Sequence, residues 1–204
     1  MNRLVSYYNI TRFIISQIAK NWGKKMERIT ENNHFLIRDS KFQDYADFAR
    51  WEIDPAVTEF LSFDEGRTYE DVVNEAIAWK GNDSVMDLAI EDKKTEKTIG
   101  RIIITRIDRH SDSLDITKLY IGDSDYRGKG VGEEVMKSLL AYFFTFMHME
   151  RVSLDYYTGN KVAMALYEKL GFSDEGVARN ATKKDGRYYD LHLMSLLRTE
   201  FFAK

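Results

Sequence analysis

The chain has 204 residues, of which 44% are hydrophobic, and this proportion fits one large domain with a single core. Its formal net charge of −3 argues against a protein that coats nucleic acid, because such domains are usually basic. Cysteine is absent, which excludes disulfides, thiolate metal sites and a cysteine nucleophile.

Residues 1–28 contain the first predicted element. Their basic residues face a single acid, Glu27, and their apolar side chains fall near helical spacing, which predicts a basic amphipathic helical extension. We expect this helix to pack on the domain or on a second copy of the chain, so a homodimer stays open; the alternative is a helix on a membrane surface. No run of about 18 apolar residues and no signal peptide are found, so we expect a cytoplasmic protein without stable membrane insertion.

Residues 29–204 predict one domain of strands and helices. In chain order, the patterns predict a strand at 34–38, helices at 41–53 and 68–82, strands at 86–92, 98–108 and 114–122, a helix at 130–149, a strand at 151–157, a helix at 160–170, and strands at 171–181 and 187–197. This order gives three consecutive antiparallel strands and then strand–helix–strand crossovers. We therefore predict an α/β (α+β) domain with a mixed central sheet of about six to seven strands flanked by helices.

A glycine-rich loop stands between the strand at 114–122 and the helix at 130–149. Gly128, Gly130 and Gly132 alternate with other residues there, although glycine at this density weakens both helix and strand. The first turn of a helix has unpaired N–H groups and partial positive charge, and glycines let a ligand approach them. With Arg127 and Lys129 nearby, the pattern predicts a cradle for a diphosphate; the alternative is a tight turn without a ligand.

Two common phosphate-binding patterns do not match this loop. The dinucleotide pattern would need glycine where Glu133 stands, and the P-loop pattern would need serine or threonine where Gly130 follows Lys129. The four histidines are scattered without an i, i+4 pair, so we expect no metal site either. A nicotinamide-binding domain and a P-loop ATPase are therefore not supported.

A second motif follows about thirty residues after the glycine loop. Asn160, Ala163, Met164 and Tyr167 share one helical face. The pattern N-x-x-A-x-x-x-Y-x-x-x-G-F is present from Asn160 to Phe172, and [QR]-x-x-G-x-[GA] is present at 127–132. Over about residues 30–200 the chain resembles the GCN5-related N-acetyltransferase (GNAT) superfamily, and most closely its branch of ribosomal-protein-alanine and diamine N-acetyltransferases.

The resemblance implies acetyl-CoA as the donor and an amine as the acceptor. The net charge of the chain predicts no nucleic acid as partner. It also implies that the diphosphate binds the glycine loop, that the pantetheine arm runs along the preceding strand, and that this strand splays from the one at 151–157. Asn160 then holds the coenzyme or an ordered water, and it also fits a helix N-cap. The expected coenzyme-binding residues are Leu119, Tyr120, Ile121, Arg127, Gly128, Lys129, Gly130, Val131, Gly132 and Asn160.

The resemblance further implies direct attack of the amine in a ternary complex, with Tyr167 as the acid that gives a proton to the departing thiolate. The alternative for Tyr167 is a core tyrosine with a satisfied hydroxyl. Asp115 is the candidate base, although the family pattern would place this acid nearer Ile116 or Thr117. Asp155 and Tyr156 lie in the same region and are not ranked.

We therefore predict an N-acetyltransferase that acts on a protein N-terminus or a small amine. A non-catalytic acyl-CoA sensor and a polyamine N-acetyltransferase are the alternatives. Asp64 and Glu65, between the first two predicted helices of the domain, would suit a polyamine, or are solvated loop acids.

Overall fold

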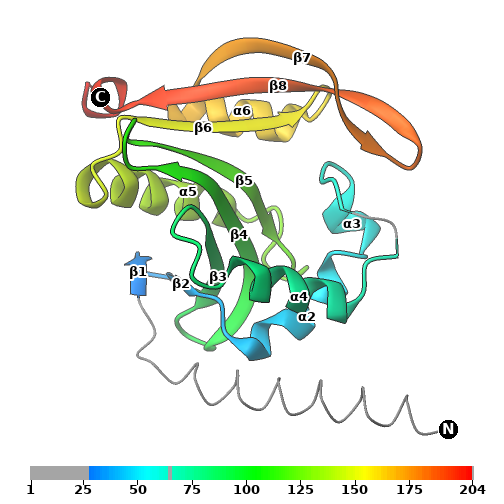
Figure 1. The fold of residues 1–204 in the computed structure, drawn as a ribbon. Helices are drawn as coiled ribbons and strands as arrows, with labels where there is room; N and C mark the ends of the chain where they lie inside the picture. The colour runs from blue at the N-terminus through cyan, green and yellow to red at the C-terminus, as the bar shows by residue number, and fades with distance from the viewer. Residues whose placement is uncertain (1–27, 64–65, 204) are drawn as a thin grey trace, which may run out of the picture.

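The computed structural model describes residues 28–63 and 66–203 (Figure 1). The predicted helix in residues 1–28 lies outside the described residues, except for Arg28, which begins a strand. The strands are β1 (Arg28–Glu31), β2 (Phe35–Asp39), β3 (Met86–Asp92), β4 (Lys97–Asp108), β5 (Ser113–Ile121), β6 (Arg151–Tyr157), β7 (Ser173–Lys184) and β8 (Arg187–Leu197). The helical segments are η1 (Phe42–Asp44), α2 (Tyr45–Trp51), α3 (Pro55–Thr58), α4 (Tyr69–Trp79), α5 (Val131–Ala141), η2 (Tyr142–Phe146), α6 (Lys161–Leu170) and α7 (Arg198–Phe202).

One sheet contains all eight of these strands, in the order β1-β2-β3-β4-β5-β6-β8-β7. The expected class is confirmed, and the strand beyond the predicted number is β1, which pairs with residues 36–38 of β2. Neighbouring strands are antiparallel except β5 and β6, which are parallel and joined through α5. Because β8 lies between β6 and β7, only one of the predicted crossovers joins strands that are neighbours in the sheet.

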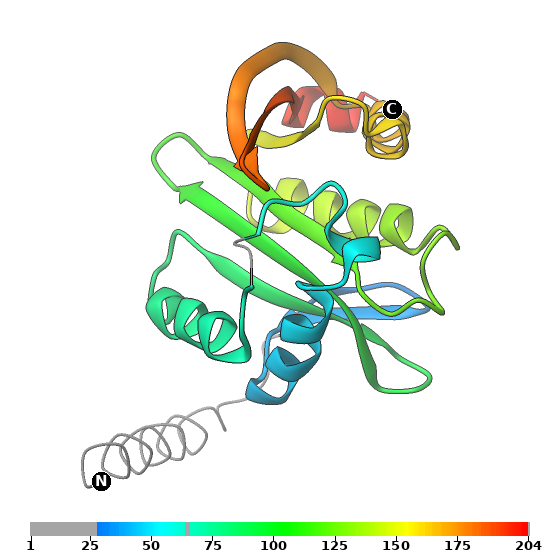
Figure 2. The ribbon, with the colours of Figure 1, turned by 90° about the vertical axis from the view of Figure 1, so that its right-hand side faces the viewer.

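Helices cover both faces of the β1–β5 half of the sheet (Figure 2). On one face α5 buries Val135, Met136 and Leu139, which recur at helical spacing, against strand residues that include Ile104 and Ile116. We call this side the α5 face. On the other side, the α4 face, α2 and α4 bury a second cluster against the sheet. Its members include Phe48, Trp51, Val72, Val73, Ala89 and Tyr120.

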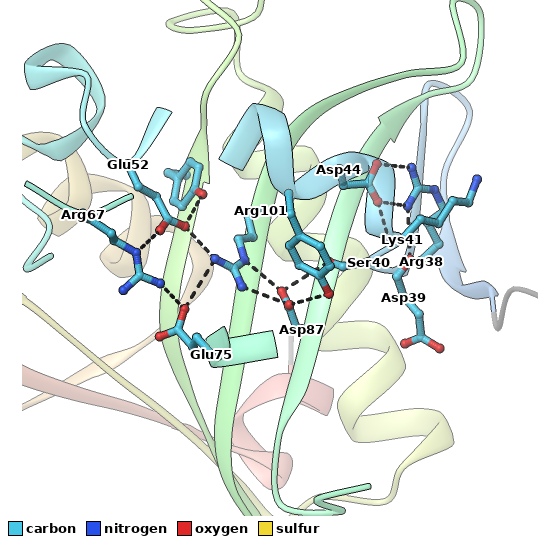
Figure 3. A network of polar contacts seen from close by, with 12 residues as sticks. Arg38, Asp39, Ser40, Lys41, Asp44, Glu52, Arg67, Glu75, Asp87 and Arg101 are labelled. Atoms are coloured by element: carbon cyan, nitrogen blue, oxygen red, sulfur yellow. Dashed lines mark hydrogen bonds and ion pairs between the residues drawn. The ribbon is translucent and has the colours of Figure 1, made fainter. Parts of the chain in front are cut away.

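A buried polar network crosses the α4 face (Figure 3). The guanidinium of Arg101 donates to Glu52 at 2.6 Å and to both carboxylate oxygens of Asp87 at 2.8 and 2.9 Å. Glu52 also accepts from Arg67 at 2.6 Å and from the Tyr120 hydroxyl at 2.8 Å. Burial alone would lower the pKa of Arg101, but the nearby carboxylates raise it well above its ordinary value. The network thus ties the end of α2 to three neighbouring strands.

Candidate active site

The central sheet opens between β5 and β6. These strands pair only from Ser113 to Ile116 and from Arg151 to Leu154, and beyond Ile116 and Leu154 they separate. A bulge accompanies the opening, because Ile103 and Ile104 of β4 face Lys118 and Ile116, which leaves Thr117 between them. In the separated part of β5, backbone groups that point away from β4 have no strand partner and can bind an extended ligand.

The glycine loop follows β5 at the wide end of this gap. Gly128 and Gly130 have φ values of 71° and 80°, a left-handed conformation that disfavours other residues. Gly130 is the N-cap of α5 and offers no side chain, so the N–H groups of Val131 and Gly132 lack intrahelical acceptors. A Cβ built on Gly128, Gly130 or Gly132 meets no atom within 4 Å, so open space lies beside the loop. These features fit an anion at the start of α5.

Gly122 fixes the beginning of this loop. A Cβ at this position would lie 1.9 Å from the Trp51 ring, so only glycine allows α2 to pack so closely. A pocket of about 340 Å³ beside it is lined in part by Arg50, Asp54 and Arg127. The Arg127 guanidinium lies 3.7 Å from the Asp54 carboxylate.

Both acids in the first turn of α5 have side-chain partners. Glu133 bonds to Lys137 and to Lys169 of α6, each at 2.7 Å, and these hydrogen bonds lower the pKa of Glu133. Glu134 lies 2.9 Å from His34. The two lysines therefore offset the negative charge that Glu133 brings to the start of α5.

Two aspartates lie close together on the α4 face of the gap. Asp115 is buried, and its carboxylate contacts Arg106 at 2.7 Å, Ser153 at 3.0 Å and Thr117 at 3.1 Å. Asp155, the first residue of β6 beyond the part paired with β5, pairs with Leu193 of β8, but its side chain has no hydrogen bond or ion pair within the described residues. Asp155 is among the exposed residues, yet partial burial of its carboxyl raises its pKa, the charge of Asp115 raises it further, and Arg106 opposes both.

Tyr167 approaches the gap from the α5 face. Its ring packs against Tyr156 at 5.8 Å and Phe172 at 5.9 Å, and the residue joins the cluster that contains α5. Burial, together with the charge of Asp155, raises the pKa of Tyr167 to about 12, so the hydroxyl is protonated at neutral pH. Within the described residues this hydroxyl has no hydrogen-bond partner, unlike that of an ordinary core tyrosine.

Asn160 begins α6 beside this tyrosine. Its side-chain oxygen accepts a hydrogen bond from the Ala163 N–H at 3.0 Å, so the expected N-cap is present. The amide nitrogen of Asn160 is not used by that cap.

The segment after α3 crosses the gap on the α4 face. Ser62 bonds to the Tyr157 hydroxyl of β6 at 2.9 Å and to Thr182 of β7 at 2.8 Å. Next to it, the Phe63 ring contacts Tyr120 and Lys118 of β5. The tip of the β7–β8 hairpin also reaches this segment, because Lys184 donates to the Glu59 carbonyl at 3.0 Å. Ser62, Phe63 and the hairpin tip thus lie over part of the gap on its α4 face.

The comparisons with known proteins agree with this geometry. Residues 34–173 match the model of the acetyltransferase (GNAT) domain. The chain belongs to the GNAT family. It is therefore an acetyl-CoA-dependent N-acetyltransferase, as predicted. Its matches include a putative ribosomal and a spermidine N-acetyltransferase, which supports the resemblance to the ribosomal-protein-alanine and diamine branch.

Two relatives and one solved structure illustrate the likeness. The uncharacterized N-acetyltransferase p20 of Bacillus licheniformis is 24% identical over 81% of this chain and 93% of its own length. The SPbeta prophage-derived uncharacterized N-acetyltransferase YokL of Bacillus subtilis is 37% identical over 37% of this chain and 43% of its own. Spermidine N-acetyltransferase from Vibrio cholerae, in complex with CoA and spermine, superposes with a TM-score of 0.76 at 19% identity. That match covers 84% of this chain and 99% of the neighbour.

The cosubstrate is acetyl-CoA, and the loop and the open edge of β5 fit its diphosphate and its pantetheine arm. In the part of the chain described here, no cluster of three or more acids and histidines could hold a metal. No helix among the same residues has the length and apolarity to span a membrane.

Sequence reasoning did not find several residues of the site. Arg106 was missed because its left-handed backbone, with φ of 52°, is what brings it to Asp115, and nothing in the sequence signals it. Lys169 was missed because it reaches the start of α5 from another helix. Asp155 was named but not ranked as a candidate base, because the sequence does not show whether its carboxylate is paired in the folded chain.

Proposed function

We propose that this enzyme acetylates an α-type primary amine, on a protein N-terminus or a small molecule, by direct attack in a ternary complex. One observation carries the proposal. At the gap, an unpartnered carboxylate with a raised pKa, Asp155, lies on the α4 face, and a protonated hydroxyl, Tyr167, approaches from the α5 face. A base on one side and an acid on the other suit an amine and a thioester that meet in the gap.

Acetyl-CoA supplies the activated acetyl thioester. Asp155, directly or through a water, takes a proton from the amine as the C–N bond forms. Tyr167 donates its proton toward the sulfur as the C–S bond breaks, and its pKa of about 12 keeps that proton on the oxygen until then. We assign the base to Asp155 rather than to Asp115, because the partners of Asp115 already occupy its oxygens.

The coenzyme-binding residues are part of the same proposal. Gly128, Gly130 and Gly132 leave room for the diphosphate, and Arg127 and Lys129 add positive charge. The backbone of residues 119–121 binds the pantetheine arm, and the free amide nitrogen of Asn160 donates to it or to a water.

The choice of an α-amine follows from its pKa. An α-amino group has a pKa of about 7.7–8.0, so roughly one in ten is neutral at pH 7, against fewer than about one in a thousand for a lysine-type amine. A polyamine is the second candidate, because the structural neighbour is a spermidine N-acetyltransferase with bound spermine. Asp64 and Glu65, which would favour it, lie outside the described residues.

The test compares kcat/KM at pH 7 for a peptide that begins with alanine or serine and for spermidine, with acetyl-CoA as donor and thiol release as the readout. We expect the peptide or a small α-amine to be preferred. A preference for spermidine of tenfold or more would replace the α-amine with a polyamine.

A further inference from the structure

Lys118 is a cation on the α4 face of the gap, and the reaction proposed above does not use it. It lies on β5 just beyond the last pair with β6, and its ammonium is 4.1 Å from the centre of the Phe63 ring. Side chains alternate along a strand, and Lys118 faces the α4 side together with Tyr120. Lys118 and Asp155 thus belong to the two strands that bound the gap, on the face where Ser62 and Phe63 cover it.

The ammonium of Lys118 has no carboxylate partner within the described residues. Glu52 and Glu75 act on Lys118 through their charge, but both form ion pairs with Arg67 and Arg101 instead. Burial lowers the pKa of Lys118, against the effect of those two acids. Among the described residues this ammonium contacts an aromatic ring and no carboxylate, so it gains from a counter-ion. Lys118 is only partly buried, so a ligand can reach it.

We propose that Lys118 binds a carboxylate of the acceptor, so that the substrate is an α-amine with a negative group close by. The inference rests on the proposed function and names its substrate class. The carboxylate comes from a free amino acid or from an acidic side chain near the start of a peptide. A polyamine is disfavoured, because it would bring further positive charge beside Lys118 and Arg67.

Two matched acceptor pairs test this assignment. Serine and serinamide differ at one carboxylate, and so do amidated tetrapeptides that begin Ser-Asp and Ser-Asn. We expect the charged member of one pair to have a kcat/KM at least about tenfold above its neutral partner, mainly through KM. The pair that shows the difference identifies the source of the carboxylate.

Variants connect the preference to the side chain. Lys118→Met keeps the stem and removes the charge, so it should abolish the difference within the pair and leave the neutral acceptor within about twofold. Lys118→Arg should keep the difference, and Lys94→Met, a surface control in the turn after β3, should behave as the native protein. Equal rates within both pairs, or a difference that survives in Lys118→Met, would overturn the inference.

Calorimetry separates this inference from the proposed function. If none of the amines releases thiol, the proposed function fails. Binding of the charged acceptors to the CoA-loaded protein then still decides the role of Lys118: binding that Lys118→Met weakens supports it, and binding that is absent or unchanged rejects it.

Discussion

Asp155 and Asp115 lie beside the same gap, but only one of them is free to accept a proton. A general base must be ionised, so activity falls as the pH drops through its pKa. Because burial and Asp115 raise the pKa of Asp155, we expect the acidic limb of the kcat/KM profile to lie above the ordinary aspartate value of about 3.9. In Asp155→Asn, kcat/KM should fall by roughly 10²–10⁴-fold and the limb should disappear. A limb that persists in this variant would transfer the role of base to another group.

Tyr167 offers a second test at the level of one atom. Tyr167→Phe keeps the ring against Tyr156 and Phe172 and removes the hydroxyl. We expect kcat to fall by roughly 10²–10⁴-fold while the affinity for acetyl-CoA, measured by calorimetry, barely changes. An unchanged kcat would leave Tyr167 as a packing residue.

Single residues also mark the limit of what the sequence can predict about the site. Tyr167, Asn160 and the glycines belong to local motifs, so the sequence alone is enough to name them as candidates. Lys118 and Arg106 could not be, because their roles depend on a bulge in β5 and on a left-handed residue in β4. Both features arise from strand pairing, which a local pattern does not contain.

The glycine loop and α5 act together as one element. Gly130→Asp introduces a side chain and a negative charge where we propose that the diphosphate binds, so we expect near-complete loss of acetyl-CoA binding in a folded protein. Gly81→Asp is the matched control, because Gly81 also has a positive φ, of 79°, with open space around its Cβ position, but lies in the turn after α4. Native affinity in folded Gly130→Asp would contradict the cradle.

Most elements were predicted within a few residues, because amphipathic periodicity and turn residues mark them. The exceptions have physical causes. The predicted helix at 130–149 changes after Ala141 to the π-helical turn η2, and α3 and α7 are too short to show periodicity. The position of β8 between β6 and β7 is a long-range choice, which the order of elements along the chain did not reveal.

For the whole molecule, the described residues already contain a complete sheet and both of its cores. A truncated chain that begins at Met26 keeps β1 and both motifs, so we expect it to fold and to bind acetyl-CoA with native affinity. Thermal unfolding, calorimetry and sedimentation velocity check this. Aggregation, or a monomer where the full chain is a dimer, would show instead that residues 1–25 belong to the core or to an interface between copies.

The short pairing between β5 and β6, which we call the seam, has a consequence for local opening of the sheet. Within the described residues, the β1–β5 half of the sheet is paired with the β6–β8 half through four residue pairs. The amide protons of these residues should therefore exchange with solvent sooner than those of β3 and β4. A coenzyme that lies along β5 and against the start of α5 would add contacts that hold the two halves of the sheet together. Its binding should therefore slow exchange along this seam more than elsewhere, and the bound enzyme should open as one cooperative unit rather than two.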